Sequence, residues 1–434
     1  MRRRALLATT GGLLTGGLAG CLAAPGASTE STGGIPEGTW PQVAYDSRNT
    51  RHPSDATGPR DGGEIAWRAL GDRPVYPPVV ENDLYLTEAW TDGAAFSLGT
   101  VDGRERWSNS DLPPIRWAPA LAEDRVFVLS REPGNVVRLH ALGTETGEQA
   151  WVRDEGITAS SGEHPPISPT VREGSIYIAS NRGVVACDAA TGDVDWTATL
   201  GHHVVDIADG PTWRTDWAKP AVTADRVFTF DTNENYRTTR EVHAVARATG
   251  EDEWTAELDV GDGWYLTGHV VAGSERVFVS VLKPNVSVDQ GDSEWSGAGR
   301  LFALDAASGS VEWDWEPSRT TLTTPAYADG TLYVGAWNPT DADQRLHALD
   351  ATDGSTAWTY PVTESVQTPT IGRDTVYLSH GRELTALATA DGTRRWRLEL
   401  GTPAGPPVVA GDTAYLRTNP GHDDDSQLLA VRAP

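Results

Sequence analysis

Short runs of alternating apolar and polar residues, separated by turn residues, fill the chain from about residue 60 to its end. Residues 125–128 (RVFV), 175–178 (SIYI) and 331–334 (TLYV) are examples, and each follows a proline, a short apolar stretch and a polar turn such as Asp329-Gly330. Period-two alternation of branched and aromatic residues predicts half-buried strands, and Asp-Gly suits a tight hairpin. After the first twenty or so residues no long helical period appears, so we expect an all-β fold.

Eight pairs of a glycine and a tryptophan four residues later recur along the chain, at an average spacing of 47 residues. The pairs are Gly63/Trp67, Gly103/Trp107, Gly147/Trp151, Gly192/Trp196, Gly250/Trp254, Gly309/Trp313, Gly354/Trp358 and Gly392/Trp396. A small and an apolar residue precede most of these glycines, as in Ala303-Leu304, which predicts a strand, a glycine turn and a second strand. With the hairpin before it, each unit has four short antiparallel strands, the composition of a propeller blade.

The two ends of the chain supply complementary halves of one unit. Residues 429–434 form the small-apolar strand without a glycine turn or tryptophan, whereas residues 61–67 have the glycine and tryptophan without the strand before them. We therefore predict an eight-bladed β-propeller of four-stranded antiparallel blades over residues 40–434, with the last blade closed by the N- and C-terminal strands. In this interpretation the eight tryptophans dock blade on blade, and Trp67→Ala is among the most damaging substitutions.

The first 21 residues have the pattern of an export signal. Three arginines, a short apolar stretch and Leu18-Ala19-Gly20-Cys21 follow one another, and the apolar stretch is shorter than a spanning helix requires. The segment resembles a twin-arginine signal with a lipobox, in which Cys21 receives a lipid; an uncleaved anchor is the alternative. Residues 22–39 have the composition of a flexible tether. We expect a ring on the outer face of the cytoplasmic membrane, attached through its lipid anchor only.

The charge balance excludes one class of partner. The chain has 61 acidic and 35 basic residues, a net charge of −26, and its only lysines are Lys219 and Lys283. A polyanion repels phosphate backbones, so we expect no nucleic-acid partner. The excess of acids resembles proteins of halophilic archaea, although an acidic protein from a low-salt organism is the alternative. Two cysteines cannot form a disulfide framework or a zinc site.

Two strings carry a family resemblance. Residues 301–309 (LFALDAASG) and 184–192 (VVACDAATG) are similar to the Ala-Leu-Asp-x-x-Thr-Gly-x-x-x-Trp repeat of the pyrrolo-quinoline-quinone-type (PQQ-like) β-propellers, and the resemblance covers nearly all of residues 61–434. That family includes quinoprotein dehydrogenases, which bind the quinone with calcium in the central channel. It also includes non-enzymatic lipoproteins similar to the propeller subunit of the bacterial outer-membrane assembly machinery, which bind protein partners.

The chain departs from the enzymes of this family. Quinoprotein alcohol dehydrogenases have two adjacent cysteines beside the cofactor, whereas Cys21 lies in the signal and Cys187 occupies the apolar position of a repeat strand. No convergent carboxylates for calcium can be singled out, so we predict no catalytic residues, metal or cofactor. The expected function is a monomeric, non-enzymatic protein-binding or envelope scaffold. A PQQ- and calcium-dependent quinoprotein dehydrogenase is the alternative.

Two long units offer loops for binding. The intervals from Trp196 to Trp254 and from Trp254 to Trp313 are 58 and 59 residues, and extra residues in a repeat usually form loops on one face. The second insertion contains Asn285, which begins an N-x-S/T sequon and is a candidate for glycosylation or an unused site. The first insertion, a partner-binding loop or less readily a metal site, contains His202, His203, Asp206, Asp209, Trp213, Asp216 and Trp217.

A ring of residues before the opening prolines is predicted to lie at the mouth of the channel. Such a mixture of aromatic and hydrogen-bonding groups suits a peptide or small ligand, or merely caps strand ends. His422 and residues 423–425 (DDD) could hold calcium or form a solvated surface. The predicted channel-mouth residues are Tyr76, Trp117, Lys219, Thr324 and Gln367, together with His269, which aligns at the proline position itself.

Overall fold

The computed structural model describes residues 37–71, 73–88, 93–115, 117–132, 136–154, 168–180, 183–200, 216–232, 240–285, 296–317, 320–338, 344–362, 364–418 and 426–434. These ranges fall in one compact unit, Thr32–Pro434. Strands and turns account for the regular structure of the described ranges, and no membrane-spanning helix is found among them.

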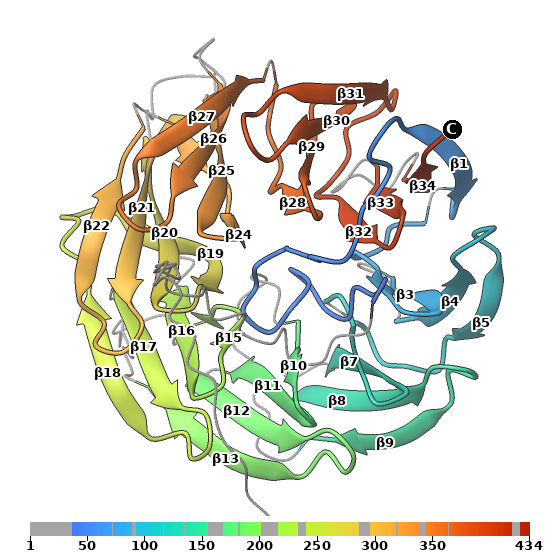
Figure 1. Ribbon diagram of the computed structural model, residues 1–434. Helices are drawn as coiled ribbons and strands as arrows, with labels where there is room; N and C mark the ends of the chain where they lie inside the picture. Colours follow the sequence, from blue (N-terminus) through green and yellow to red (C-terminus); the bar gives the residue numbers. More distant parts are fainter. Residues whose placement is uncertain are drawn as a thin grey trace, which may run out of the picture. The chain divides into compact units, whose positions relative to one another are not determined.

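Eight antiparallel sheets are arranged in a ring, one for each unit of the sequence repeat (Figure 1). Each contains four strands in order from the axis to the rim, and two sheets have one further short strand. The predicted all-β, eight-bladed propeller is thus confirmed. The strand that opens each blade lies nearest the axis, and the strand that carries the repeat tryptophan lies at the rim.

The innermost strands are β2 (Val79–Val80), β6 (Ala120–Ala122), β10 (Thr170–Arg172), β15 (Ala221–Val222), β19 (Tyr265–Ala272), β24 (Ala326–Ala328), β28 (Thr370–Ile371) and β32 (Val408–Ala410). The second strands are β3 (Asp83–Thr87), β7 (Arg125–Glu132), β11 (Ser175–Ser180), β16 (Arg226–Thr232), β20 (Arg276–Asn285), β25 (Thr331–Trp337), β29 (Thr375–His380) and β33 (Thr413–Arg417). The third strands are β4 (Ala95–Gly99), β8 (Val136–Gly143), β12 (Gly183–Asp188), β17 (Glu241–Ala246), β21 (Ser296–Asp305), β26 (Arg345–Asp350), β30 (Glu383–Ala388) and β34 (Leu428–Arg432). The outer strands are β5 (Glu105–Asn109), β9 (Gln149–Arg153), β13 (Val194–Thr199), β18 (Asp252–Glu257), β22 (Val311–Trp315), β27 (Thr356–Pro361), β31 (Arg394–Glu399) and β1 (Glu64–Ala69), and the two extra strands are β14 (Asp216–Trp217), beside β16, and β23 (Thr321–Leu322), beside β25.

The ring closes where the two ends of the chain share a blade. Strand β1 pairs antiparallel with β34, with Ile65 opposite Val431 and Trp67 opposite Ala430. The eighth sheet therefore has the order β1-β34-β33-β32, as predicted from the complementary ends of the sequence. Opening the ring at this blade requires the loss of the complete pairing between β1 and β34. The blade shared by the two chain ends is therefore held by a full set of strand hydrogen bonds.

Each repeat tryptophan joins two blades. Trp67 lies 6.0 Å, between ring centroids, from Tyr415 of its own blade, and its indole Nε1 donates to the Thr100 oxygen of the next blade at 3.0 Å. Its ring also covers Gly103, where an added Cβ would lie 2.7 Å from the indole. The turn glycine therefore has two functions, since its φ of +66° suits glycine and its missing side chain makes room for the indole.

The same contact recurs around the ring. Trp396 of the seventh blade covers Gly63 and donates to the Pro59 oxygen, so the same contact joins the seventh blade to the eighth. The indole nitrogen of Trp151 has no hydrogen-bond partner among the described residues, although its ring covers Gly192. The remaining indole donations run from Trp107 to Thr144 O, Trp196 to Arg247 O, Trp254 to Ala306 O, Trp313 to Ala351 O and Trp358 to Thr389 O.

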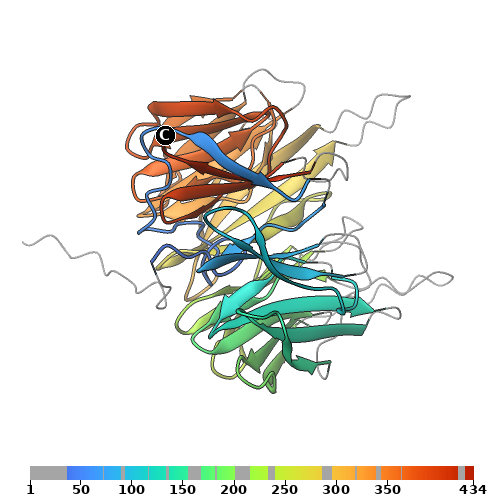
Figure 2. The same ribbon diagram turned by 90° about the vertical axis from the view of Figure 1, so that its right-hand side faces the viewer.

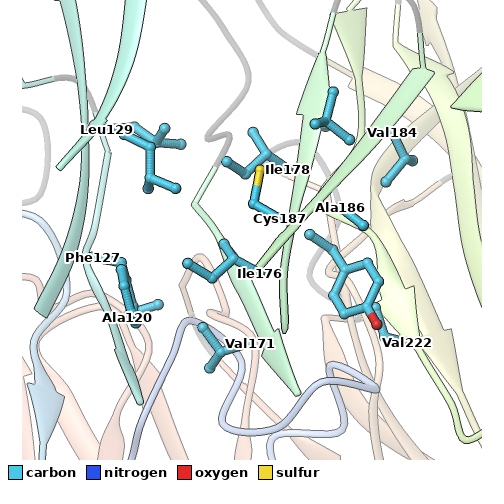
Figure 3. Close-up of a cluster of buried hydrophobic side chains, with 14 of the residues drawn as sticks. Ala120, Phe127, Leu129, Val171, Ile176, Ile178, Val184, Ala186, Cys187 and Val222 are labelled. Atoms are coloured by element: carbon cyan, nitrogen blue, oxygen red, sulfur yellow. The ribbon is translucent and has the colours of Figure 1, made fainter. Parts of the chain in front are cut away.

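Apolar side chains fill the space between adjacent sheets. Figure 3 shows one such cluster, where the sulfur of Cys187 in β12 lies beside Ile178 and Leu129 belongs to the facing sheet. Burial raises the pKa of the Cys187 thiol to about 12. This cysteine is thus a buried apolar side chain in the wall of the ring and not a reactive group.

Candidate functional site

A segment that precedes the first blade lies across the centre of the ring (Figure 1, darkest blue). We call residues 40–58 the axial segment. The innermost strand of a propeller blade has a free edge toward the axis, where its backbone groups need partners once water is excluded. The axial segment supplies these partners. Its neighbours include the turns that follow the innermost strands, such as Asp329 and Gly411, and Figure 2 shows it on one side of the ring.

Seven innermost strands donate an N–H group to the axial segment, each from an apolar or aromatic residue at or near its end. In the eighth blade the Gly411 oxygen instead accepts from the N–H groups of Thr57 and Gly58. The axial segment therefore contacts all eight blades and closes one end of the channel. The seven bonds are Val80 N to Trp40 O, Leu121 N to Pro41 O, Val171 N to Gln42 Oε1, Val222 N to Ser47 O, Ala272 N to Arg48 O, Tyr327 N to Thr50 O and Ile371 N to Arg51 O.

A buried aspartate holds the axial segment in an irregular conformation. Asp46 Oδ1 accepts from the Thr50 N–H at 2.9 Å, and its Oδ2 accepts from the Thr50 hydroxyl at 2.9 Å. Asn49 and Arg51 on this loop have φ values of +62° and +55°, a region that non-glycine residues rarely adopt. The strained backbone directs these two side chains down the channel, toward the beginnings of the innermost strands.

Asn49 and Lys219 meet on one side of the channel. The Lys219 Nζ donates to Asn49 Oδ1 at 2.5 Å and to the Thr170 hydroxyl at 2.9 Å, and the Asn49 amide donates to the oxygens of Pro220 and Val270. Lys219 is only 3% exposed, and burial lowers its pKa to about 7, against the opposing effect of Asp46. At neutral pH this lysine is therefore only partly protonated.

Arg51 lies on the other side of the axial segment, among neutral acceptors. Its Nε donates to the Pro369 oxygen at 2.9 Å, and its Nη2 donates to the Thr370 hydroxyl at 2.8 Å and the Pro407 oxygen at 2.7 Å. Arg51 is 7% exposed and has no carboxylate partner among the described residues. Burial lowers the pKa of this guanidinium to about 9. A buried, charged guanidinium without a counter-ion is unfavourable unless another group compensates it.

His269 completes the cluster from the fifth blade. It lies in a bulge of β19, where the register shifts between Thr267 and Val271. Its Nε2 is buried without a hydrogen-bond partner, and burial together with the charges of Lys219 and Arg51 lowers its pKa to about 3. Bulges often redirect a side chain beside a functional site. We refer to Asn49, Arg51, Lys219 and His269 as the axial cluster.

The bulge corrects the predicted alignment of His269. In other blades the residue after the opening proline pairs with an aromatic residue, as Ala326 pairs with Tyr333. In the fifth blade Val271 pairs with Phe278, so Val270 occupies the proline position and His269 precedes it. The alignment at the proline position was wrong because the bulge inserts residues that the sequence repeat does not reveal.

The other predicted channel-mouth residues lie in several environments. Thr324 is half-buried beside Gly268, and Trp117 is buried in the apolar layer between the second and third blades. The Gln367 and Tyr76 backbones pair with the second strands of their own blades, and both side chains are half-buried. Of the six residues, Lys219 and His269 are near enough for the charge of Lys219 to lower the pKa of His269.

The sequence interpretation missed Asn49 and Arg51. Both belong to a stretch that precedes the repeat, so no period marks them. The one available signal was the presence of Trp40 and Tyr45, which are too apolar for a tether and are buried in the structure. A buried aromatic pair, with ring centroids 5.4 Å apart, indicates that this stretch packs into the ring.

Several predicted sites lie partly or wholly outside the described residues. Cys21, the histidines and acids between residues 202 and 213, and the run at 422–425 belong to this group. Asp216 and Trp217 form β14, and Asn285 ends β20 opposite Ser296, but the side chains of these three residues are not described. Glycosylation at Asn285 stays a prediction.

The described residues do not fit a calcium-bound quinone. No group of three or more His, Cys, Asp and Glu side chains among them is arranged to hold a metal ion. At the axis the carboxylate that acts on Lys219 is Asp46, and both of its oxygens already accept hydrogen bonds from Thr50. The charged side chains of the axial cluster itself, Arg51 and Lys219, are basic and do not bind calcium.

Comparison with known proteins finds one matching family model and several solved structures with a similar fold. The model of the family described as outer membrane protein assembly factor BamB matches residues 56–236 and 238–433. Quinohemoprotein alcohol dehydrogenase from Comamonas testosteroni is similar in structure, with a TM-score of 0.64 and 14% identity over 92% of this chain and 82% of that one. BamB from Moraxella catarrhalis has a TM-score of 0.55 and 15% identity over 86% of this chain and 98% of that one. A computationally designed protein, Ika8, has a TM-score of 0.59 and 10% identity over 84% of this chain and 99% of that one. No match is found among the curated proteins. At these identities the solved structures show a shared fold alone.

Proposed function

Because the chain belongs to the family described as outer membrane protein assembly factor BamB, we propose that it is a non-enzymatic scaffold that binds a protein partner. The partner binds at the end of the channel opposite the axial segment. Function in propellers is set by the groups at the channel and its loops and not by the ring itself. The proposal therefore rests on what the axis contains.

The observation that supports this proposal is the closure of the channel by residues 40–58. An enzyme of the quinone type uses the channel for its cofactor, whereas here a segment of the chain contacts every blade from one end. The polar side chains it directs inward, Asn49 and Arg51, hydrogen-bond to the innermost strands. The side chains of the axial segment are thus held in place before a partner binds, and half-buried residues surround them. Such a preformed surface suits recognition of another protein.

The proposal includes a place for the ring outside the cytoplasmic membrane. The arginine-rich start and the Leu-Ala-Gly-Cys string support export and lipid attachment at Cys21. The net charge of −26 and the two lysines support a halophilic source. Cys21→Ala should release the protein from membranes, which fractionation and mass spectrometry of the N-terminal peptide would measure. If the variant stays in the membrane fraction, the anchor is not a lipid at this residue.

Site-specific crosslinking in membranes at high salt tests partner binding. A photoreactive phenylalanine analogue replaces Gln367, which is half-buried and precedes an opening proline, or, as control, Asp391, an exposed turn residue at the rim. We expect a discrete adduct from position 367 and none of the same mass from position 391. The same adducts from both positions, or none from position 367 in repeated trials, would count against a partner at this end of the channel.

The alternative of a quinoprotein dehydrogenase is favoured by one observation, the structural similarity to quinohemoprotein alcohol dehydrogenases. The described residues do not fit the calcium-bound cofactor, so no catalytic step is assigned to them. Adding the quinone and calcium to the purified protein, followed by dye reduction with alcohols or sugars, decides between the two functions. Binding with dye reduction would replace the scaffold proposal.

A further inference from the structure

The axial cluster contains two nearly buried basic side chains that hydrogen-bond to no carboxylate among the described residues, although Arg51 also lies over the Trp40 ring, 5.4 Å from its centroid. Arg51 donates three hydrogen bonds, all to neutral oxygens, and Lys219 donates to an amide and a hydroxyl. Asp46 is the acid that acts on Lys219, and it is also 3.6 Å from Arg48. In a chain of net charge −26, two nearly buried cations without a bound carboxylate are unexpected on electrostatic grounds.

Donor capacity is also unused at the same place. The printed hydrogen bonds of Arg51 involve Nε and Nη2 and leave its Nη1 without a partner among the described residues. The Lys219 ammonium has three hydrogens and two acceptors, and the His269 Nε2 is buried without a partner. Buried polar groups in proteins are nearly always paired, so these open donor positions are places where a ligand or an ion could bind.

The three side chains come from different parts of the chain, and the charges of two of them lower the pKa of the third. His269 responds to the charges of both Lys219 and Arg51. Asn49 links two of them, because it accepts from Lys219 and donates to the Val270 oxygen beside His269. The bulge that contains His269 and the positive φ of Arg51 are local distortions of the kind that functional sites retain.

A ligand would have to approach from the end of the ring opposite the axial segment. The carbonyl groups that receive the Asn49 and Arg51 side chains belong to Pro220, which directly precedes β15, to Val270, near the end of β19, and to Pro369, which directly precedes β28. His269 is half-buried, as is Thr324, which lies beside Gly268. Lys219 and Arg51 thus lie between the axial segment and the innermost strands.

We propose that the axial cluster binds a single carboxylate group, held by Arg51, Lys219 and His269. This inference rests on the proposed function, because a partner would supply the carboxylate from an acidic side chain or its C-terminus. A free small carboxylic acid has the same chemistry. Charge-assisted hydrogen bonds from a guanidinium and an ammonium are the usual means of holding a carboxylate in a partly dry site.

Calorimetric titration of the full chain with acetate at pH 7 and fixed ionic strength tests the proposal. We expect millimolar or tighter binding, with uptake of protons, because a bound carboxylate favours the charged form of Lys219. Titration in two buffers of different ionisation enthalpy measures this uptake. Lys219→Met should weaken binding at least about tenfold and abolish most of the proton uptake. Lys283→Met removes the other, exposed lysine and should change neither.

Two further arms identify the source of the carboxylate. N-acetyl-triglycine carries a free C-terminal carboxylate, and N-acetyl-triglycinamide is its neutral control. Binding of the acid but not the amide supports a carboxylate presented by a protein, and binding of acetate alone supports a free small acid. His269→Ala provides a second variant in case Lys219→Met does not fold, and it should weaken acetate binding severalfold.

Some outcomes would overturn the inference. These are no heat from acetate up to about 50 mM, equal binding by Lys219→Met and the wild type, or equal binding of the acid and the amide. The acetate measurement does not involve the partner. If acetate binds as expected but crosslinking at position 367 gives no adduct, the proposed function fails and the anion site stands.

Discussion

The wall and the axis of the ring are built in different ways. In the wall, one contact recurs in every blade: an indole lies between an aromatic residue of its own sheet and a turn glycine of the next. At the axis, the side-chain contacts of Asn49 and Arg51 occur once each. Asn49 bonds to the fourth and fifth blades, whereas Arg51 bonds to the seventh and eighth.

This difference separates the residues that hold the ring together from those that determine what the ring binds. A repeated contact between neighbouring blades, made by the tryptophan and the glycine, helps to close the ring without depending on the residues at the axis. The polar side chains at the axis are not repeated from blade to blade, so they break the eightfold symmetry of the ring. They therefore form a single site. We therefore expect substitutions in the wall to change stability and substitutions at the axis to change binding and pH dependence.

The largest effect is expected from Trp67→Ala. It removes an indole from the blade that the two chain ends share, with its hydrogen bond to Thr100 and its contact with Gly103. The free energy of unfolding should fall by about 3–5 kcal/mol, as measured by denaturant titration. Trp315→Ala is the matched control, because Trp315 is a half-buried tryptophan outside the repeat. An equal loss in both variants would mean that the repeat position has no special role.

A smaller effect is expected from Gly103→Ala. Its φ is +66° and an added Cβ would lie 2.7 Å from the Trp67 indole, whereas Gly330 has a φ of +79° and nothing within 4 Å. Gly330→Ala should cost about 1 kcal/mol through backbone strain alone. Gly103→Ala should cost roughly 1–3 kcal/mol more because it also displaces the indole. Equal thermal shifts in the two variants would remove the second function assigned to the turn glycine.

The buried basic groups at the axis should make the free energy of unfolding depend on pH. The pKa of Lys219 is about 7 in the folded protein, below its ordinary value of 10.5, so the unfolded chain binds more protons between these values. The free energy of unfolding should therefore rise as pH increases from 7 to 9, by at most ~1.4 kcal/mol per unit. Arg51 and His269, whose pKa values are also lowered, act in the same direction above about pH 9 and below about pH 6.5.

Lys219→Met isolates this contribution. The variant should lose most of the slope between pH 7 and 9, while Asp46, Arg51 and His269 remain around the position. Denaturant titrations at a series of pH values measure it, with Lys283→Met as the control. A slope that survives in Lys219→Met would show that the buried lysine is not the group that titrates.

The sequence predicts the wall well because the wall is periodic. The spacing of glycine and tryptophan predicts the number of blades, and the incomplete units at the two ends predict the pairing of Ile65 with Val431. The axis has no period. Asn49 and Lys219 are 170 residues apart and each occurs once in its role, so only the folded chain brings them together. The bulge at His269 likewise depends on how β19 pairs with β20.

The most direct test of this account is amide hydrogen exchange at the innermost strands. Without the axial segment, the N–H groups of Val80, Val222 and Ile371 would face the channel on free edges; with it, they donate to residues 40–51. We predict that these amides exchange only on global unfolding, as slowly as the amides paired between second and third strands. Exchange as fast as that of the free edges of the outer strands would show that the axial segment does not close the channel.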